Sequence, residues 1–170
     1  WIIHYTNRTL VYPFRIRTRG KKMPWVIVLS AIFFNCVNAG LNGYFLAHFD
    51  PYDTSSFMNW NFYAGIALFV SGFLINQISD HILIHLMKPG ESGYKIPNGF
   101  LFKYVSCPNL FGELMQWSGF AIMAWNYPAL SFLIWTGANL IPRALGHHRW
   151  YKKHFDDYPE NRKSMIPGIL

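Results

Sequence analysis

The sequence predicts an all-α, multi-pass transmembrane helix bundle that forms a single domain over residues 1–170. Hydrophobic residues make up 52% of the chain and charged residues only 14%. The hydrophobic residues are gathered in long runs, several of which could cross the ~30 Å hydrocarbon core of a bilayer as helices. The formal net charge of +7 is concentrated between these runs, which is typical of a membrane protein and not of a nucleic-acid-binding domain.

About five helices are expected, and the first covers residues 1–14. Three polar side chains at spacings of three and four share one face of it: Tyr5, Arg8 and Tyr12. The second helix is expected at residues 24–48, beginning at Pro24, and its length of about 38 Å is enough to span a bilayer. Gly40 and Gly43 in this helix would permit close contact with a neighbouring helix.

The remaining three helices each carry a polar face near one end. The third, residues 57–87, has Asn76 and Asp80 one turn apart. The fourth, residues 110–125, is preceded by Asn109 and has Glu113 in its first turn. The fifth runs from residue 128 to residue 146 and leads into a polar stripe at i, i+4 spacing. The stripe consists of Arg143, His147 and Tyr151.

The segments between the expected helices alternate in charge. Residues 15–22, 88–105 and the tail after 152 are basic, whereas residues 49–56 are acidic and 126–128 are uncharged. The positive-inside rule therefore places the three basic segments at the cytosolic face. In that orientation the polar faces of four helices converge at the cytosolic end, which predicts a cavity there. Its basic rim suits a ligand that carries phosphate.

Other kinds of site receive less support. His81 and His85 are four residues apart and could bind a metal from one helix face, but a position among lipid headgroups explains them better, so we predict no metal. No Gly-x-Gly-x-x-Gly follows a strand, which argues against a Rossmann domain. A single asparagine in a membrane helix usually contacts another helix, whereas an intramembrane carboxylate such as Glu113 indicates function.

Several stretches together resemble the steroid 5α-reductase (3-oxo-5α-steroid 4-dehydrogenase) family. They are residues 4–12, Asn76-Gln-Ile-Ser-Asp80, residues 88–97, Asn109-Leu-Phe-Gly-Glu113, and residues 143–163. They follow the family order along nearly the whole chain. Because the family has seven helices, the resemblance implies an N-terminally truncated chain. The glutamate that partners Tyr5 in the family is expected in the missing helices.

The resemblance also implies a chemistry. The family uses NADPH to transfer a hydride to C5 of the Δ4 double bond of a 3-oxo-steroid, and Tyr5 matches the catalytic tyrosine that hydrogen-bonds the C3 carbonyl. Trp117 and Phe34 match substrate-binding positions. The positions expected to bind or flank the cofactor are Arg8, Tyr12, Asn76, Asp80, Tyr94, Asn109, Glu113, Arg143, His147 and Tyr151.

Three alternatives remain at this point. An isoprenylcysteine-carboxyl-type methyltransferase, which binds S-adenosylmethionine, has a similar C-terminal pattern of His, Arg and Tyr. A trans-2-enoyl-CoA reductase shares the hydride chemistry, and a sterol-binding scaffold protein needs no cofactor. For the reductase we expect a steroid or related enone lipid as substrate, membrane lipid as the surroundings, no nucleic acid, and a monomer. The membrane would be the endoplasmic reticulum in a eukaryote and the inner membrane in a bacterium, with the cofactor site facing the cytosol.

Overall fold

The computed structural model describes residues 1–16, 23–49, 57–88, 91 and 93–170. Within these residues the chain is helical with no strand, and an isolated bridge pairs Val105 with Lys163. The helices are α1 (Ile2–Thr6), α2 (Tyr12–Arg15), α3 (Trp25–Phe49), α4 (Trp60–Ile84), α5 (Pro108–Ala124) and α6 (Tyr127–His154). A π-helical turn (Asn7–Val11) joins α1 to α2, so residues 2–15 form one continuous helical segment. The predicted all-α bundle of about five helical segments is confirmed.

Some helix ends differ from the predicted ones. α4 was expected over residues 57–87 but is shorter at both ends, because Asn59 has an extended backbone and His85 leaves helical geometry. α6 runs eight residues past the predicted end at 146. Its last turn holds Lys152, Lys153 and His154, and positive charge there interacts favourably with the helix dipole. Most of the predicted loops 15–22 and 49–56 lies outside the described residues, as do residues 89, 90 and 92.

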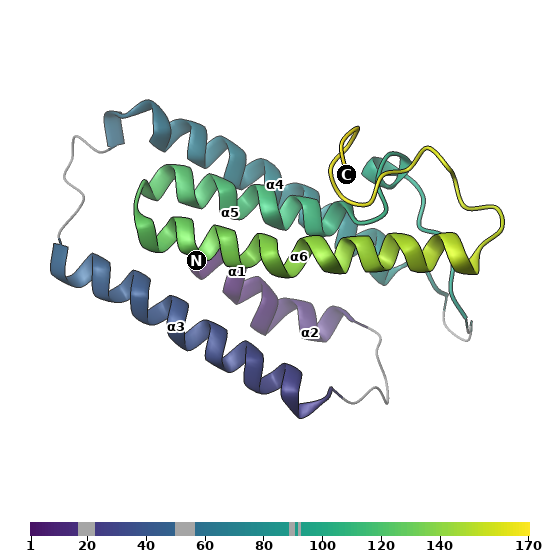
Figure 1. Cartoon of the computed structure of the whole chain (residues 1–170), viewed down its shortest axis with the longest axis horizontal. Coiled ribbons are helices and arrows are strands. Elements are labelled where there is room, and N and C mark those ends of the chain that lie inside the picture. Colours follow the sequence, from purple (N-terminus) through teal and green to yellow (C-terminus); the bar gives the residue numbers. More distant parts are fainter. Residues whose placement is uncertain (17–22, 50–56, 89–90, 92) are drawn as a thin grey trace.

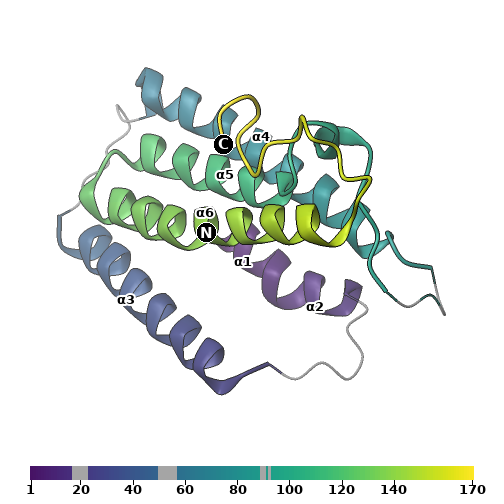
Figure 2. The same ribbon diagram turned by 45° about the vertical axis from the view of Figure 1, so that its right-hand side comes forward.

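Three long helices lie side by side, with α5 between α4 and α6 (Figures 1 and 2). The short segment of α1 and α2 packs against this group, and α3 lies outside it. Aromatic rings connect α3 to α6, because Phe33 and Phe34 both contact Trp135, at ring-centroid distances of 6.4 and 5.1 Å. α3 is thus held at the edge of the bundle by a few large side chains.

Glycines bring α4 and α5 into backbone contact. Gly65 and Gly72 on α4 are seven residues apart, and so are Gly112 and Gly119 on α5. A Cβ atom added to Gly112 would lie 2.6 Å from the carbonyl oxygen of Gly72, and one added to Gly119 would lie 2.6 Å from that of Gly65. Only glycine permits such an approach. Gly40 and Gly43, which were expected to permit a close helix contact, form none with the described residues, since a Cβ added there would meet nothing within 4 Å.

Gly112→Ala is therefore expected to destabilise the protein by about 1–3 kcal/mol, because the added methyl group must force two backbones apart. The measurement is thermal unfolding of the detergent-solubilised protein. Gly40→Ala is the matched control: it also adds a methyl group to a glycine in a long apolar helix, but in open space, and should leave the midpoint unchanged or slightly higher. Equal midpoints for the two variants would contradict the proposed role of the glycine contacts.

Two helices among the described residues are long and apolar enough to cross a membrane. They are α3, with a mean hydropathy of 1.6, and α4, with 1.5. The core helix of a water-soluble protein would pass the same test, but it would be mostly buried. In α3 only 11% of the apolar window is buried inside the protein, and in α4 only 22%. Apolar surface exposed to this extent is suited to contact with lipid.

Candidate functional site

An arginine bridged to two carboxylates lies at the centre of the site. Arg8 Nη1 is 3.0 Å from Asp80 Oδ2, and Arg8 Nη2 is 2.8 Å from Glu113 Oε2. The Asn109 side-chain amide donates to the other oxygen of Asp80, Oδ1, at 3.2 Å. Asn76 holds Asn109 in position, because its side-chain amide donates to the backbone oxygen of Asn109 at 2.9 Å. We call Arg8, Asp80, Asn109 and Glu113 the Arg8 cluster.

The backbone explains why these side chains meet. Asp80 lies two turns beyond Gly72 on α4, and Glu113 directly follows Gly112 on α5, so the glycine contact draws the two carboxylates together. The Asp80 side chain is only 2% exposed. A carboxylate buried to that degree needs a positive partner. Arg8 supplies it and thereby fastens the N-terminal helical segment to α4 and α5.

Tyr12 and Arg15 extend the site along the N-terminal segment. The Arg8 guanidinium lies 4.9 Å from the centroid of the Tyr12 ring, a distance suited to a cation–π interaction. Arg15 donates to the side-chain oxygen of Gln77 at 3.3 Å. The sequence prediction that Arg8 and Tyr12 lie near Asp80 and Glu113 is confirmed, although Arg8 occupies the centre and not the edge.

Tyr5 precedes Arg8 by three residues, about one helical turn, and lies within a cluster of aromatic rings. Its ring stacks on Trp1 with a centroid distance of 5.1 Å and lies 6.2 Å from Trp117. Next to it, the buried His4 ring meets Gln116, with Nδ1 at 3.2 Å from Oε1. The other amide atom of Gln116, Nε2, is buried and has no hydrogen-bond partner among the described residues. The pair of His4 and Gln116 therefore lies next to the Tyr5 ring, and Gln116 Nε2 is a donor with no partner among the described residues.

Trp117 and Phe34, predicted to bind substrate, are joined by a third ring. Trp117 is 1% exposed and meets Phe132 edge-to-face at 4.5 Å. Phe34 stacks on the same Phe132 ring, with a centroid distance of 5.6 Å. The structure thus brings both residues into the aromatic cluster that holds Tyr5.

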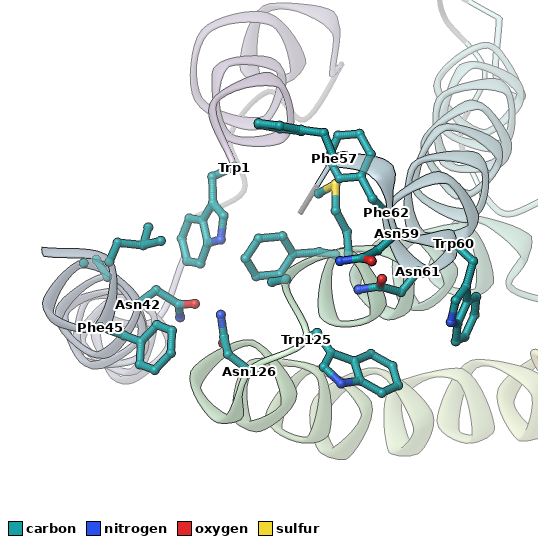
Figure 3. Close-up of a pocket in the computed structure, with 16 residues that line it drawn as sticks. Trp1, Asn42, Phe45, Phe57, Asn59, Trp60, Asn61, Phe62, Trp125 and Asn126 are labelled. Atoms are coloured by element: carbon teal, nitrogen blue, oxygen red, sulfur yellow. The ribbon is translucent and has the colours of Figure 1, made fainter. Parts of the chain in front are cut away.

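An apolar cavity of about 870 Å³ lies on the far side of the aromatic cluster, toward the opposite end of the α4–α5 pair from Asp80. Trp1 and Phe120 belong to both the cluster and the cavity wall. Figure 3 shows Trp1, Asn42, Phe45, Trp60, Asn61 and Asn126 around this space. Tyr5 accordingly lies between a charged cluster and an apolar cavity.

The C-terminal stripe lies apart from the Arg8 cluster. Arg143 and His147 are exposed, and no hydrogen bond or ion pair joins either of them to the cluster within the described part of the chain. Tyr151 instead stacks on Tyr158, with a centroid distance of 5.4 Å and an interplanar angle of 8°. Tyr94, also exposed, contacts Trp150 edge-on at 4.8 Å. These four residues were predicted to bind the cofactor beside Asp80 and Glu113, and that role stays a prediction.

The loop before α5 is organised by its own polar contacts. Glu91 accepts hydrogen bonds from Lys95 Nζ at 2.5 Å and from the backbone N–H of Lys88 at 2.8 Å. These bonds lower the pKa of the Glu91 carboxyl, with the Lys95 bond as the larger cause. The carboxylate is therefore ionised at neutral pH, and Glu91 links Lys88 to Lys95 through its two hydrogen bonds.

The C-terminal tail closes over the end of this loop. Arg162 is 4% exposed and donates to the backbone oxygen of Pro97 at 3.0 Å and to Asn98 Oδ1 at 2.7 Å. Ser106 Oγ lies 2.6 Å from both His148 Nδ1 and the Tyr158 hydroxyl. Since Pro108 begins α5, these contacts fix the chain immediately before Asn109 and so support the Arg8 cluster.

Arg162→Met should weaken this closure while leaving the helices in place, because it removes both hydrogen bonds to residues 97–98. Hydrogen–deuterium exchange of residues 94–105 should become at least about fivefold faster, as expected for the loss of 1 kcal/mol or more. The matched control is Arg149→Met, since Arg149 is an exposed arginine on α6. Unchanged exchange in Arg162→Met would contradict the role of the tail as a clamp.

Three features of the site were not predicted from the sequence, namely Gln116, His4 and the glycines between α4 and α5. Gln116 lies three residues after Glu113 and so on the same side of α5, but its pairing with His4 depends on how the N-terminal segment packs. The role of His4 was likewise not predicted. The α4–α5 glycines carried a readable signal, namely two pairs with the same seven-residue spacing, which places each pair on one helix face.

These features define a helical membrane protein with a buried charged cluster at one end and an apolar cavity toward the other. The family model described as 3-oxo-5-alpha-steroid 4-dehydrogenase matches residues 21–170. The chain belongs to this family.

Individual relatives agree with the family match. The chain is 43% identical over 172 residues to Steroid 5-alpha-reductase DET2 of Solanum lycopersicum, a match that covers 99% of this chain and 66% of the relative. It is 44% identical over 170 residues to 3-oxo-5-alpha-steroid 4-dehydrogenase 1 of Bos taurus, covering 100% of this chain and 66% of the relative. The human protein of the same name is 42% identical, with 100% and 65% covered. The chain thus spans about two thirds of the length of these relatives.

Proposed function

We propose that the protein is an NADPH-dependent membrane reductase that transfers a hydride to C5 of the Δ4 double bond of a 3-oxo-steroid. The observation that carries this proposal is the position of Tyr5, between the Arg8 cluster and the apolar cavity. A reductase of a lipid enone needs a polar site for the cofactor and an apolar site for the substrate, with a hydrogen-bond donor between them. The names of the relatives support the choice of a steroid.

The residues near Tyr5 fit a dinucleotide. Asp80 and Glu113 offer carboxylate oxygens suited to ribose hydroxyls, and Asn76 adds an amide. The buried Nε2 of Gln116 is a donor without a partner in the described part of the chain, which suits an amide or carbonyl oxygen of a ligand. The exposed Arg143 and the basic loops suit phosphate. NADPH, when bound, supplies the hydride.

In this proposal Tyr5 acts on the substrate carbonyl. Its phenol hydroxyl donates a hydrogen bond to the C3 oxygen, which draws electron density from the conjugated double bond and makes C5 more electrophilic. As C5 gains the hydride, negative charge develops on the oxygen and the same bond strengthens. C4 then takes up a proton. The rings of Trp1 and Trp117 pack against the Tyr5 ring and so restrict its orientation.

The orientation in the membrane belongs to the same proposal. In the sequence, the basic segments 15–22 and 88–105 adjoin the helix ends that hold the Arg8 cluster, so by the positive-inside rule this end would face the cytosol. The acidic segment 49–56 follows α3 at the end where the cavity lies. The cofactor would then enter from the cytosol and the steroid from within the membrane.

The test is purified full-length protein incubated with NADPH and a Δ4-3-oxo-steroid. We expect steroid-dependent oxidation of NADPH and a product saturated at C4 and C5. Binding of S-adenosylmethionine, with neither binding nor oxidation of NADPH, would overturn the proposal in favour of a methyltransferase. Oxidation of NADPH with an enoyl-CoA but with no steroid would favour an enoyl-CoA reductase.

A further inference from the structure

A buried hydrogen bond joins the helix that carries Tyr5 to α5, one turn away from the ion pairs of Arg8. His4 Nδ1 lies 3.2 Å from Gln116 Oε1, and the two residues are 4% and 0% exposed. We propose that His4 and Gln116 are positioning residues for the reduction, because their hydrogen bond sets the rotation of α1 at which the Tyr5 hydroxyl meets the substrate carbonyl. The inference rests on the proposed function and adds two residues to that site.

The two atoms of this hydrogen bond have fixed roles. Gln116 Oε1 is a carbonyl oxygen and can only accept, so His4 Nδ1 carries the hydrogen and donates it. The His4 ring meets the Tyr5 ring edge-on at a centroid distance of 5.3 Å and the Trp117 ring at 4.8 Å. Because His4 directly precedes Tyr5 in the chain, fixing the imidazole also fixes the backbone from which the phenol projects.

Gln116 is a rigid attachment point for this bond. It lies where α4 and α5 are in backbone contact, since a Cβ added to Gly72 would collide with the backbone nitrogen of Gln116. Close-packed helices transmit strain and do not shift independently. Glu113, one turn earlier on α5, holds Arg8. The pairs Arg8–Glu113 and His4–Gln116 are therefore successive contacts between two antiparallel helices.

The ion pairs of Arg8 do not by themselves fix the rotation of α1. This helix has five residues, Ile2–Thr6, and the π-helical turn that contains Arg8 follows it directly. Ile2 and Ile3 are 83% and 62% exposed, so they add little packing. Among the described residues, α1 has no other side-chain hydrogen bond to the rest of the bundle. The hydrogen bond to α5 is therefore the polar contact that sets its rotation.

The experiment replaces His4 with two side chains of nearly equal shape in the full-length protein. His4→Asn keeps an N–H donor close to the position of Nδ1, whereas His4→Leu loses it. With NADPH and a Δ4-3-oxo-steroid, kcat of His4→Leu should be at least about tenfold below that of His4→Asn, since a slightly misplaced reacting group is costly. The Kd for NADPH should be the same in both variants, because the Arg8 cluster is unchanged.

A double-mutant cycle separates positioning from a general effect on stability. If the bond acts by orienting the Tyr5 hydroxyl, its loss has no further effect once that hydroxyl is absent. The difference in rate between His4→Asn and His4→Leu should therefore vanish in the Tyr5→Phe background, as measured by single-turnover kinetics. A role in stability alone would lower the unfolding midpoint and leave the ratio of the two rates the same in both backgrounds.

Gln116→Met breaks the same bond from α5 with a flexible side chain of similar length. Its loss of kcat should likewise vanish in the Tyr5→Phe background, so this variant decides the question if His4→Leu does not fold. The matched control is His48, an exposed histidine of α3 whose Nδ1 lies 3.0 Å from the backbone oxygen of Tyr44. His48→Asn and His48→Leu should both have the kcat of the unaltered protein.

The outcomes separate this inference from the proposed function. Equal kcat in folded His4→Asn and His4→Leu, or a difference that persists in the Tyr5→Phe background, would overturn the inference and leave the proposed function standing. If the unaltered protein reduced no Δ4-3-oxo-steroid, the proposed function itself would be overturned, and this inference with it.

Discussion

Tyr5→Phe should lower kcat for reduction of a Δ4-3-oxo-steroid by about 100- to 1000-fold, the usual effect of removing one donor to a developing oxyanion. The variant keeps the ring that stacks on Trp1 at 5.1 Å and packs near Trp117, so only the hydroxyl is lost. The Kd for NADPH should stay unchanged, because the Arg8 cluster is untouched. Steady-state kinetics and direct measurement of NADPH binding test the two parts separately.

Tyr44→Phe is the control for this prediction. Tyr44 is an exposed tyrosine of α3, 61% exposed, and removal of its hydroxyl should change neither kcat nor Kd. If Tyr5→Phe instead weakened NADPH binding and left kcat intact, Tyr5 would belong to the cofactor site, and its assigned role on the steroid carbonyl would be wrong.

Arg8→Met is expected to cause the largest loss of stability. It leaves Asp80 and Glu113 as two neighbouring carboxylates without their cation, and Asp80 is 2% exposed. Removing one partner of a buried ion pair costs about 3–5 kcal/mol. Thermal unfolding in detergent should show a much lower midpoint, and the N-terminal segment should detach from α4 and α5 before the rest unfolds.

A compensating variant separates charge from packing. In Arg8→Met/Asp80→Asn/Glu113→Gln the cluster is neutral, so most of the lost stability should return, although NADPH binding should not. Arg149→Met, at an exposed position, should leave the midpoint unaltered. Failure of the triple variant to recover stability would show that Arg8 acts through its packing on Tyr12 and not through its charge.

The sequence was sufficient to predict the main architecture and much of the site. Long apolar runs and the alternating charge between them predicted the bundle, and i, i+4 polar pairs predicted which faces meet. Asp80 on α4, Glu113 on α5 and Arg8 near the N-terminus do meet, at 3.0 and 2.8 Å. The prediction succeeded because a polar side chain in an apolar helix is costly to bury unless it contacts another polar group.

The remaining features depend on information that helical periodicity does not contain. Periodicity could not distinguish Gly40, which faces open space, from Gly112, which touches Gly72, since both lie in apolar helices. It also could not tell that Tyr151 would stack on Tyr158 of the tail. That contact requires the chain to turn back after α6, and turns of this kind are set by packing and not by local sequence.

The π-helical turn at Asn7–Val11 affects how Tyr5 is oriented relative to the ion pairs of Arg8. A π turn holds one more residue than the α-helical turn it replaces, and each residue of an α-helix corresponds to a rotation of about 100°. The angle between the part of the helix with Tyr5 and the part with Tyr12 is therefore set by a count of residues. In comparisons among relatives, a one-residue gap within this turn would reorient the phenol relative to the ion pairs even where every side chain is retained.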